Sequence, residues 1–255
     1  MDKPAQISLI RQKLKSGSIS VGSWIQLPSS SAAEIMGAAG YDWVAVDMEH
    51  GSISVQQLPD IFRALELGGT LPLARIAEGT AKDCKQALDA GAAGIIVPMI
   101  HSAEQLLKVR DYCAWPPAGK RGVGFSRTNL FGKKFEAYRH EAQTPMLVAM
   151  IEDARAISDL DSILKVAGLD AVLVGPYDLS ASLNMTADFE RTEFKSAIAE
   201  IVNKCASHRI PCGIHIVDPN PGVLRQRIAE GYRFLAYAID TVFLNHAAAY
   251  DRIGI

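Results

Sequence analysis

The sequence has no excess of positive charge, and this argues against nucleic acid or a membrane as a partner. Its 255 residues carry 26 lysines and arginines against 28 acidic residues, a formal net charge of −2. Binding to nucleic acid or to anionic lipid draws on a basic surplus that neutralises phosphates. We therefore expect a small-molecule partner, with no nucleic acid and no membrane involved.

Long hydrophobic runs and paired cysteines are also lacking. The apolar stretch at residues 94–100 is far shorter than the roughly 20 residues of a membrane helix, and charges are scattered through the N-terminal segment where a signal peptide would be apolar. Cys84, Cys113, Cys205 and Cys212 form no C-x-x-C pair and no zinc-binding spacing. The expectation is a cytoplasmic protein with free thiols.

The chain instead repeats one unit, a short apolar run followed by an amphipathic segment. Nearly continuous apolar runs are typical of parallel strands buried on both faces. Eight such runs occupy residues 20–27, 43–49, 71–76, 94–99, 146–152, 171–176, 212–217 and 234–240. Helical spacing of apolar residues occurs at 31–40, 55–69, 81–91, 102–113 and 194–208.

This alternation predicts one α/β domain over residues 1–255, a (β/α)8 TIM barrel. The alternative is an open dinucleotide-binding sheet, which needs a glycine-rich turn after the first strand, and residues 27–31 do not provide one. Two segments depart from the rhythm. Residues 115–144 form a long excursion between strands four and five. Only 15 residues, 241–255, follow strand eight, so one wall of the barrel is expected to be thin or covered by another subunit.

Charged residues gather at the carboxyl ends of the predicted strands, which is where TIM-barrel active sites lie. Glu152 and Asp178 follow consecutive strands, so they should lie side by side at the barrel mouth. Two carboxylates without cysteine or paired histidine suit Mg2+ or Mn2+, and also Co2+, with water or a chelating substrate completing the shell. The alternative is that one of them, Asp178 above all, only caps a helix.

Arg75 and His50 are the other candidates. A guanidinium in an otherwise apolar strand needs an anionic partner, from the protein or from a substrate. His50 could act as a general base, and a turn at Glu49 would be required for Asp47 to touch it. No predicted strand contains lysine, which disfavours a Schiff-base mechanism. His215, in mid-strand, is interpreted as a core histidine or one that supports the site.

A basic loop at residues 120–127 could hold an anion, although such loops are usually just solvated. Together with the strand ends it forms a specific set of motifs. These are D-M-E-H-G at 47–51, Arg75, V-P-M at 97–99, P-P-A-G-K-R-G at 116–122 and G-P-Y-D-L-S-A-S-L at 175–183. In this order they resemble the HpcH/HpaI aldolase family of metal-dependent (class II) pyruvate aldolases. The resemblance covers roughly residues 8–245.

The resemblance implies a role for each matching residue. Glu152 and Asp178 match the two metal-binding carboxylates, and Arg75 matches the arginine that binds pyruvate and stabilises its enolate. His50 matches the catalytic base. Further matches are Asp47 and Asp89, two carboxylates associated with that base, Asp89 across a subunit boundary; Gly175 and Pro176, whose backbone receives the pyruvate carboxylate; and Trp24, a pocket residue. The family also implies a swapped last helix and a homo-oligomer, a hexamer built as a trimer of dimers.

The predicted function is therefore a class II aldolase, a carbon–carbon lyase that reversibly cleaves a 4-hydroxy-2-oxo acid to pyruvate and an aldehyde through a metal-stabilised enolate. Two departures from the family pattern stand out: Met150 replaces a common glutamine, and Ile100-His101 replaces a common Val-Glu or Val-Asn. Alternatives are a metal-dependent 2-oxo acid decarboxylase, a CoA-thioester lyase on the same scaffold, and a non-catalytic barrel that binds a 2-oxo acid.

Overall fold

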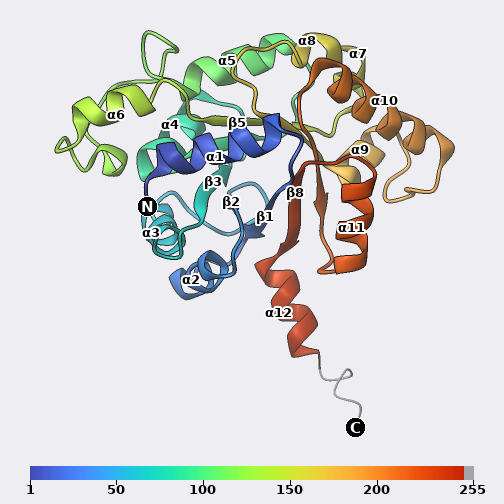
Figure 1. The fold of residues 1–255 in the computed structure, drawn as a ribbon, viewed down its shortest axis with the longest axis horizontal. Coiled ribbons are helices and arrows are strands. Elements are labelled where there is room, and N and C mark those ends of the chain that lie inside the picture. The colour runs from blue at the N-terminus through green and yellow to red at the C-terminus, as the bar shows by residue number, and fades with distance from the viewer. Residues whose placement is uncertain (250–255) are drawn as a thin grey trace.

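A computed structural model describes residues 1–249 and closes eight parallel strands into one barrel (Figure 1). Each strand pairs with the next along the chain, and β8 pairs back with β1. The strands are β1 (Ser20–Ile25), β2 (Trp43–Asp47), β3 (Leu71–Arg75), β4 (Gly94–Val97), β5 (Met146–Ile151), β6 (Ala171–Val174), β7 (Cys212–Ile216) and β8 (Phe234–Ile239). The predicted TIM barrel is confirmed. Each predicted run extends one or two residues past its strand, because the chain there already turns away from the sheet.

Helices flank the barrel, most of them on its outside. They are α1 (Lys3–Lys15), α2 (Ser30–Ala38), α3 (Leu58–Leu67), α4 (Ala81–Ala90), α5 (Ala103–Cys113), α6 (Phe135–Glu141), α7 (Ala154–Ser158), α8 (Leu160–Ile163), α9 (Pro176–Ser182), α10 (Thr192–His208), α11 (Pro221–Ala229) and α12 (Asp240–Ala248), with a 3-10 turn η1 (Arg127–Asn129). All five predicted helical segments are present. Helices α7 and α8 span five and four residues, too few for periodicity to reveal them.

Local sequence explains where the longer helices begin and end. The hydroxyls of Ser29, Thr80 and Ser102 each accept a hydrogen bond from the backbone N–H three residues later, at the starts of α2, α4 and α5. Gly91 ends α4 with a left-handed φ of 118°. The three N-caps set where each helix starts relative to the preceding strand, and so they shape the loops at the barrel mouth.

Two layers of apolar side chains form the core. The outer layer lies between the strands and the helices. The inner layer fills the barrel and includes the stacked rings of Trp43 and Phe234, whose centroids are 4.3 Å apart. Ile10 and Leu14 of α1 pack onto this inner layer. Helix α1 therefore closes the end of the barrel where the strands begin.

The predicted excursion between α5 and β5 is built around a small core of its own. Trp115, Tyr138 and Ala142 are buried together. The Arg121 guanidinium lies 5.7 Å from both aromatic ring centroids and donates to the Tyr138 hydroxyl at 2.6 Å. Arg127 pairs with Glu66 at 2.9 Å. Arg121 and Arg127 of the basic loop therefore stabilise this part of the fold. The sequence had suggested that the loop binds an anion or is simply solvated.

Helix α12 leaves the barrel after β8 and extends away from it (Figure 1). Among its described residues only Asp240 is buried, and Leu244 is well exposed. Residues 250–255 of the predicted short tail lie outside the described residues. Within residues 1–249, no helix is both long and apolar enough to cross a membrane.

Candidate active site

Arg75 and Asp47 form a buried ion pair at the carboxyl ends of β3 and β2. The two residues are register partners in the sheet. The Arg75 guanidinium donates through Nε and Nη2 to the two oxygens of Asp47, both at 2.8 Å, and through Nη1 to Glu49. The anionic partner that the sequence required for Arg75 is thus supplied by two protein carboxylates. These hydrogen bonds fix the plane of the guanidinium at the barrel mouth.

Asp47 is held from several sides. Its carboxylate also accepts hydrogen bonds from Gln26 Nε2 at 2.9 Å and from the backbone N–H groups of Glu49 and His50 at 3.0 and 3.1 Å. Burial by itself would raise the pKa of Asp47, but the hydrogen bonds and charge of Arg75 outweigh this and lower it. Asp47 therefore contacts the backbone of His50, and its charge is directed to Arg75. Gln26 was not predicted from the sequence, because only the pairing of β1 with β2 brings it near Asp47.

Glu152 follows β5 and has one oxygen bonded and one oxygen orphaned. Its Oε1 accepts from the Met99 backbone N–H at 2.7 Å. Its Oε2 is buried and has no hydrogen-bond partner among the described residues. Burial, with the negative charges of Glu49 and Asp178 adding to it, raises the pKa of Glu152 to about 7. An ionised carboxylate buried in this way would be stabilised by a neighbouring positive charge.

Asp178 lies in the first turn of α9, beyond β6. The N-cap of that helix is Gly175, and no described residue hydrogen-bonds to the Asp178 carboxylate, so the capping alternative is not supported. The charge of Asp178 contributes to raising the pKa values of both Glu152 and Glu49. The structure therefore brings the two predicted carboxylates of consecutive strands to one mouth.

Glu49 is a fourth carboxylate at this mouth, after Asp47, Glu152 and Asp178, and it was not predicted as a site residue. Burial raises its pKa, while Arg75 and His50 oppose the shift. Its place two residues after the last residue of β2 was a usable signal, since the same run already supplied Asp47 and His50. Among the described residues no three metal-binding side chains lie close enough together to make a ready-formed site.

The donor set nevertheless fits a divalent cation. Hard carboxylate oxygens are what Mg2+ and Mn2+ prefer, and such ions keep several positions for water or substrate. The buried Glu152 Oε2 and the Asp178 carboxylate, for which the described residues provide no hydrogen-bond partner, are the groups that would hold it. The charge of a cation there would also favour the ionised carboxylate and so oppose the burial that raises the pKa of Glu152.

Trp24 and His215 form the floor beneath Arg75. Trp24 is buried in β1, and its ring stacks on His215 of β7 with centroids 4.8 Å apart. The Arg75 guanidinium lies 5.7 Å from the Trp24 ring. Met150, the residue that replaces a common glutamine, packs into the same inner core. The predicted pocket residue and the predicted supporting histidine thus meet inside the barrel.

The side chains of two predicted residues, His50 and Asp89, make no hydrogen bond with this cluster among the described residues. His50 is exposed at the mouth, beyond the Asp47–Arg75 pair. Asp89 is in the last turn of α4, which ends just before β4 begins. Asp47 is the last residue of its strand, so Asp89 lies at the opposite end of the barrel from Asp47 in the same chain.

Two other acids at strand ends serve the structure. Asp240 accepts hydrogen bonds from the backbone N–H groups of Gln26 and Leu27 at 2.9 and 3.1 Å, which fixes the loop after β1. Asp153 caps α7 and pairs with Arg155. The acidic residues at the barrel mouth are therefore of two kinds: those of the candidate site, and those, such as Asp240 and Asp153, that stabilise the neighbouring backbone.

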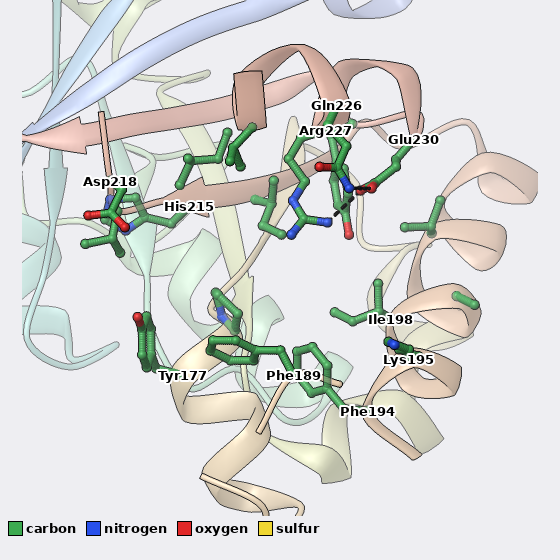
Figure 2. Close-up of a pocket in the computed structure, with 18 of the residues that line it drawn as sticks. Tyr177, Phe189, Phe194, Lys195, Ile198, His215, Asp218, Gln226, Arg227 and Glu230 are labelled. Carbon is green, nitrogen blue, oxygen red and sulfur yellow. Dashed lines mark hydrogen bonds and ion pairs between the residues drawn. The ribbon is translucent and has the colours of Figure 1, made fainter. Parts of the chain in front are cut away.

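A groove of about 790 Å3 lies along β7, between α10 and α11 (Figure 2). Phe189 and Phe194 line one side, and Arg227 and Glu230, which pair with each other at 2.7 Å, line the other. Arg75 and Glu152 do not border this groove, whereas His215, which stacks on Trp24, does. The charged cluster therefore lies at the barrel mouth, and the groove approaches it from the side of β7.

Gly175 is required by the close approach of Glu152. A Cβ added at Gly175 would lie 2.3 Å from Glu152 Oε2. We expect Gly175→Ala to displace that carboxylate and to weaken Mn2+ binding at least about tenfold. A Mn2+ titration followed by electron paramagnetic resonance checks this. Gly124→Ala, where a Cβ meets nothing within 4 Å, is the matched control and should bind like wild type; equal affinities for all three proteins would contradict the prediction.

His215 should make the fold less stable in mild acid. Burial lowers its pKa to about 4, from an ordinary value of 6.5, so the unfolded chain takes up the proton first. Its contribution is complete above pH 6.5 and is lost as the pH falls toward 4. We expect the free energy of unfolding to drop by about 2 kcal/mol more in wild type than in His215→Phe between pH 7 and pH 5. Urea denaturation at both pH values measures this, and parallel losses would refute it.

Comparison with known proteins places the chain in a family. The family model described as HpcH/HpaI aldolase/citrate lyase matches residues 20–247. The chain therefore belongs to the HpcH/HpaI aldolase/citrate lyase family, whose enzymes are divalent-metal-dependent aldolases and lyases. The predicted family and the predicted class of enzyme, a carbon–carbon lyase, are confirmed.

Individual relatives agree with this assignment. A hydroxypyruvate/pyruvate aldolase of Roseobacter denitrificans is 34% identical over 245 residues, covering 94% of each chain. A 2-keto-3-deoxy-L-rhamnonate aldolase of Klebsiella pneumoniae is 34% identical over 240 residues, covering 93% of this chain and 89% of the relative. The crystal structure of a family protein from Burkholderia cenocepacia superposes with a TM-score of 0.90 at 28% identity, covering 97% of this chain and 99% of that one.

Proposed function

We propose that this protein is a class II aldolase that reversibly cleaves a 4-hydroxy-2-oxo acid to pyruvate and an aldehyde. The observation that carries the proposal is that two groups lie at the same barrel mouth. One is the Arg75 guanidinium, fixed by Asp47, and the other is the Glu152 carboxylate, whose Oε2 has no hydrogen-bond partner among the described residues. Relatives that match nearly the whole chain bear the names of aldolases, one of them a pyruvate aldolase. A divalent ion, Mg2+ or Mn2+ or else Co2+, held by Glu152 and Asp178 would supply a Lewis acid for the 2-oxo acid.

The residues of the chain bind the substrate, stabilise the developing negative charge and accept the proton. Arg75 directs positive charge at the oxygen that becomes negative when the C3–C4 bond breaks and its electron pair moves into the pyruvate enolate. Backbone N–H groups around Gly175 and Pro176 receive the substrate carboxylate, while Pro176 itself, which has no N–H, only shapes this turn at the start of α9. Trp24 forms the pocket floor. His50, exposed at the mouth, takes the 4-hydroxyl proton, directly or through one water, as the aldehyde leaves.

Pyruvate release from a panel of 4-hydroxy-2-oxo acids tests this function. We expect release with Mg2+ or Mn2+, its loss with EDTA, and deuterium exchange at the methyl group of pyruvate under the same conditions. Release that survives EDTA would overturn the metal assignment. Deuterium exchange without release, accompanied by loss of CO2 from a 2-oxo diacid, would assign a decarboxylase instead.

We also propose that the enzyme works as a homo-oligomer, a hexamer of three dimers, in which Asp89 serves a neighbour's site. Asp89 is half-buried and lies at the far end of the barrel from Asp47 in its own chain. Burial raises its pKa, with Arg121 opposing the shift, and α12 extends away from the barrel. Light scattering gives the mass. Mixing inactive His50→Asn and Asp89→Asn subunits should restore activity, because a mixed interface can hold one intact site.

A further inference from the structure

Met99 adopts a strained backbone conformation beside the proposed metal carboxylate. It follows β4 and has a φ of 52°, in the left-handed region that a bulky side chain rarely occupies. In this conformation its N–H donates to Glu152 Oε1 at 2.7 Å. The position of Glu152 therefore depends on whatever holds Met99 in an unfavourable state.

Gln105 of α5 spans this turn with both ends of its side-chain amide. Its Oε1 accepts from the His101 backbone N–H at 3.0 Å, and its Nε2 lies 3.4 Å from the Met99 carbonyl oxygen, to which it donates. The backbone N–H of Gln105 is in turn bonded to the Ser102 hydroxyl at 3.3 Å, in the cap of the helix. The amide thus fastens both sides of residues 99–101 to the start of α5.

We propose that Gln105 is a positioning residue for metal binding, which acts by bracing the strained Met99 turn so that the Met99 N–H orients Glu152. The inference rests on the proposed role of Glu152 as a metal carboxylate. With Oε1 fixed in this way, the orphaned Oε2 is left free for the ion. Partners that orient a ligand without touching the ion commonly change metal affinity ten- to a hundredfold when removed.

Mn2+ titration of the full-length protein by electron paramagnetic resonance tests the inference. We expect Gln105→Leu, which loses both hydrogen bonds, to weaken binding about tenfold. Gln105→Glu keeps the acceptor for His101 and should lose less. Pyruvate exchange should fall at limiting Mn2+ and recover at saturating Mn2+. Gln105 is partly exposed, so these variants should fold, and circular dichroism verifies it. Glu104→Gln, its exposed neighbour on α5, is the control.

A double-mutant cycle separates bracing from a general effect on α5. Glycine adopts a left-handed φ without strain, so in a Met99→Gly background Gln105→Leu should change Mn2+ affinity by less than about threefold. An equal loss in both backgrounds, or wild-type affinity in Gln105→Leu, would overturn the inference while the metal site stands. Wild-type protein that binds Mn2+ no better than Glu152→Gln would overturn the metal site and this inference together.

Discussion

Replacing Glu152 with glutamine is expected to weaken divalent-metal binding at least about 100-fold and to abolish pyruvate release with it. Glutamine keeps the size of the side chain and can still accept from the Met99 N–H, so the loss isolates the charge. Mn2+ titration and the pyruvate assay measure the two effects. Glu136→Gln, at an exposed position of α6 where Glu136 pairs with Arg139, is the matched control and should leave both unchanged.

The same substitution should stabilise the metal-free protein. The unfolded Glu152 carboxyl ionises near 4.5, whereas in the fold its pKa is about 7, so stability is lost as the pH rises through that interval. Glu152→Gln should therefore raise the free energy of unfolding in EDTA by as much as about 3 kcal/mol at pH 8 and by little at pH 4.5. Added Mn2+ should reverse the order of stability. A variant that is less stable than wild type at pH 8 in EDTA would contradict the account of Glu152 as a carboxylate whose ionisation in the fold is disfavoured by burial.

Replacing Arg75 with alanine is the second large effect, and it should act on both rate and stability. Loss of a charge that faces the developing enolate is expected to slow pyruvate exchange about 100-fold, or about 3 kcal/mol. Asp47 would remain fully buried without its counter-ion, which should cost a further 3 kcal/mol or so of folding free energy. Exchange rates normalised to folded protein, together with urea denaturation, measure the two separately.

A second substitution distinguishes the two roles of Arg75. In Arg75→Ala with Asp47→Asn, the fully buried charge of Asp47 is removed together with its counter-ion, so most of the lost stability should return while the exchange rate does not. Arg75→Lys should lie between, because an ammonium cannot make the paired bonds from Nε and Nη2. A folded Arg75→Ala protein that loses less than threefold in rate would remove Arg75 from the proposed mechanism.

Most of the charged residues at the barrel mouth could be predicted from the sequence, because they stand in or directly after strands that are otherwise apolar. Arg75 stands at the end of an otherwise apolar strand, and Glu152 and Asp178 follow consecutive strands. In a parallel barrel all carboxyl ends of strands meet at one mouth, so order along the chain is enough to place these side chains together. Glu49 was overlooked, although it lies in the same run as Asp47 and His50.

Other features depended on contacts between segments far apart in sequence. Gln26 reaches Asp47 only because β1 pairs with β2. Nothing in the local pattern separates it from any polar residue at a strand end. The His215–Trp24 stack joins β7 to β1 across the barrel interior, and the buried position of Arg121 depends on the packing of Trp115 against Tyr138. Each of these contacts forms only because the closed barrel brings the two side chains within a few ångströms of each other.

The sequence by itself determined the class of fold, the order of strands and the identity of the charged groups at the mouth, because burial of alternating apolar segments leaves few other arrangements. Only the tertiary structure decided how those charges share their partners. It directs Asp47 to Arg75 rather than to the imidazole of His50, and it leaves one oxygen of Glu152 bonded to a strained turn and the other without a partner. The physical reason is that periodicity reports which face of an element is buried, whereas hydrogen bonds and pKa values depend on distances of a few ångströms between different elements.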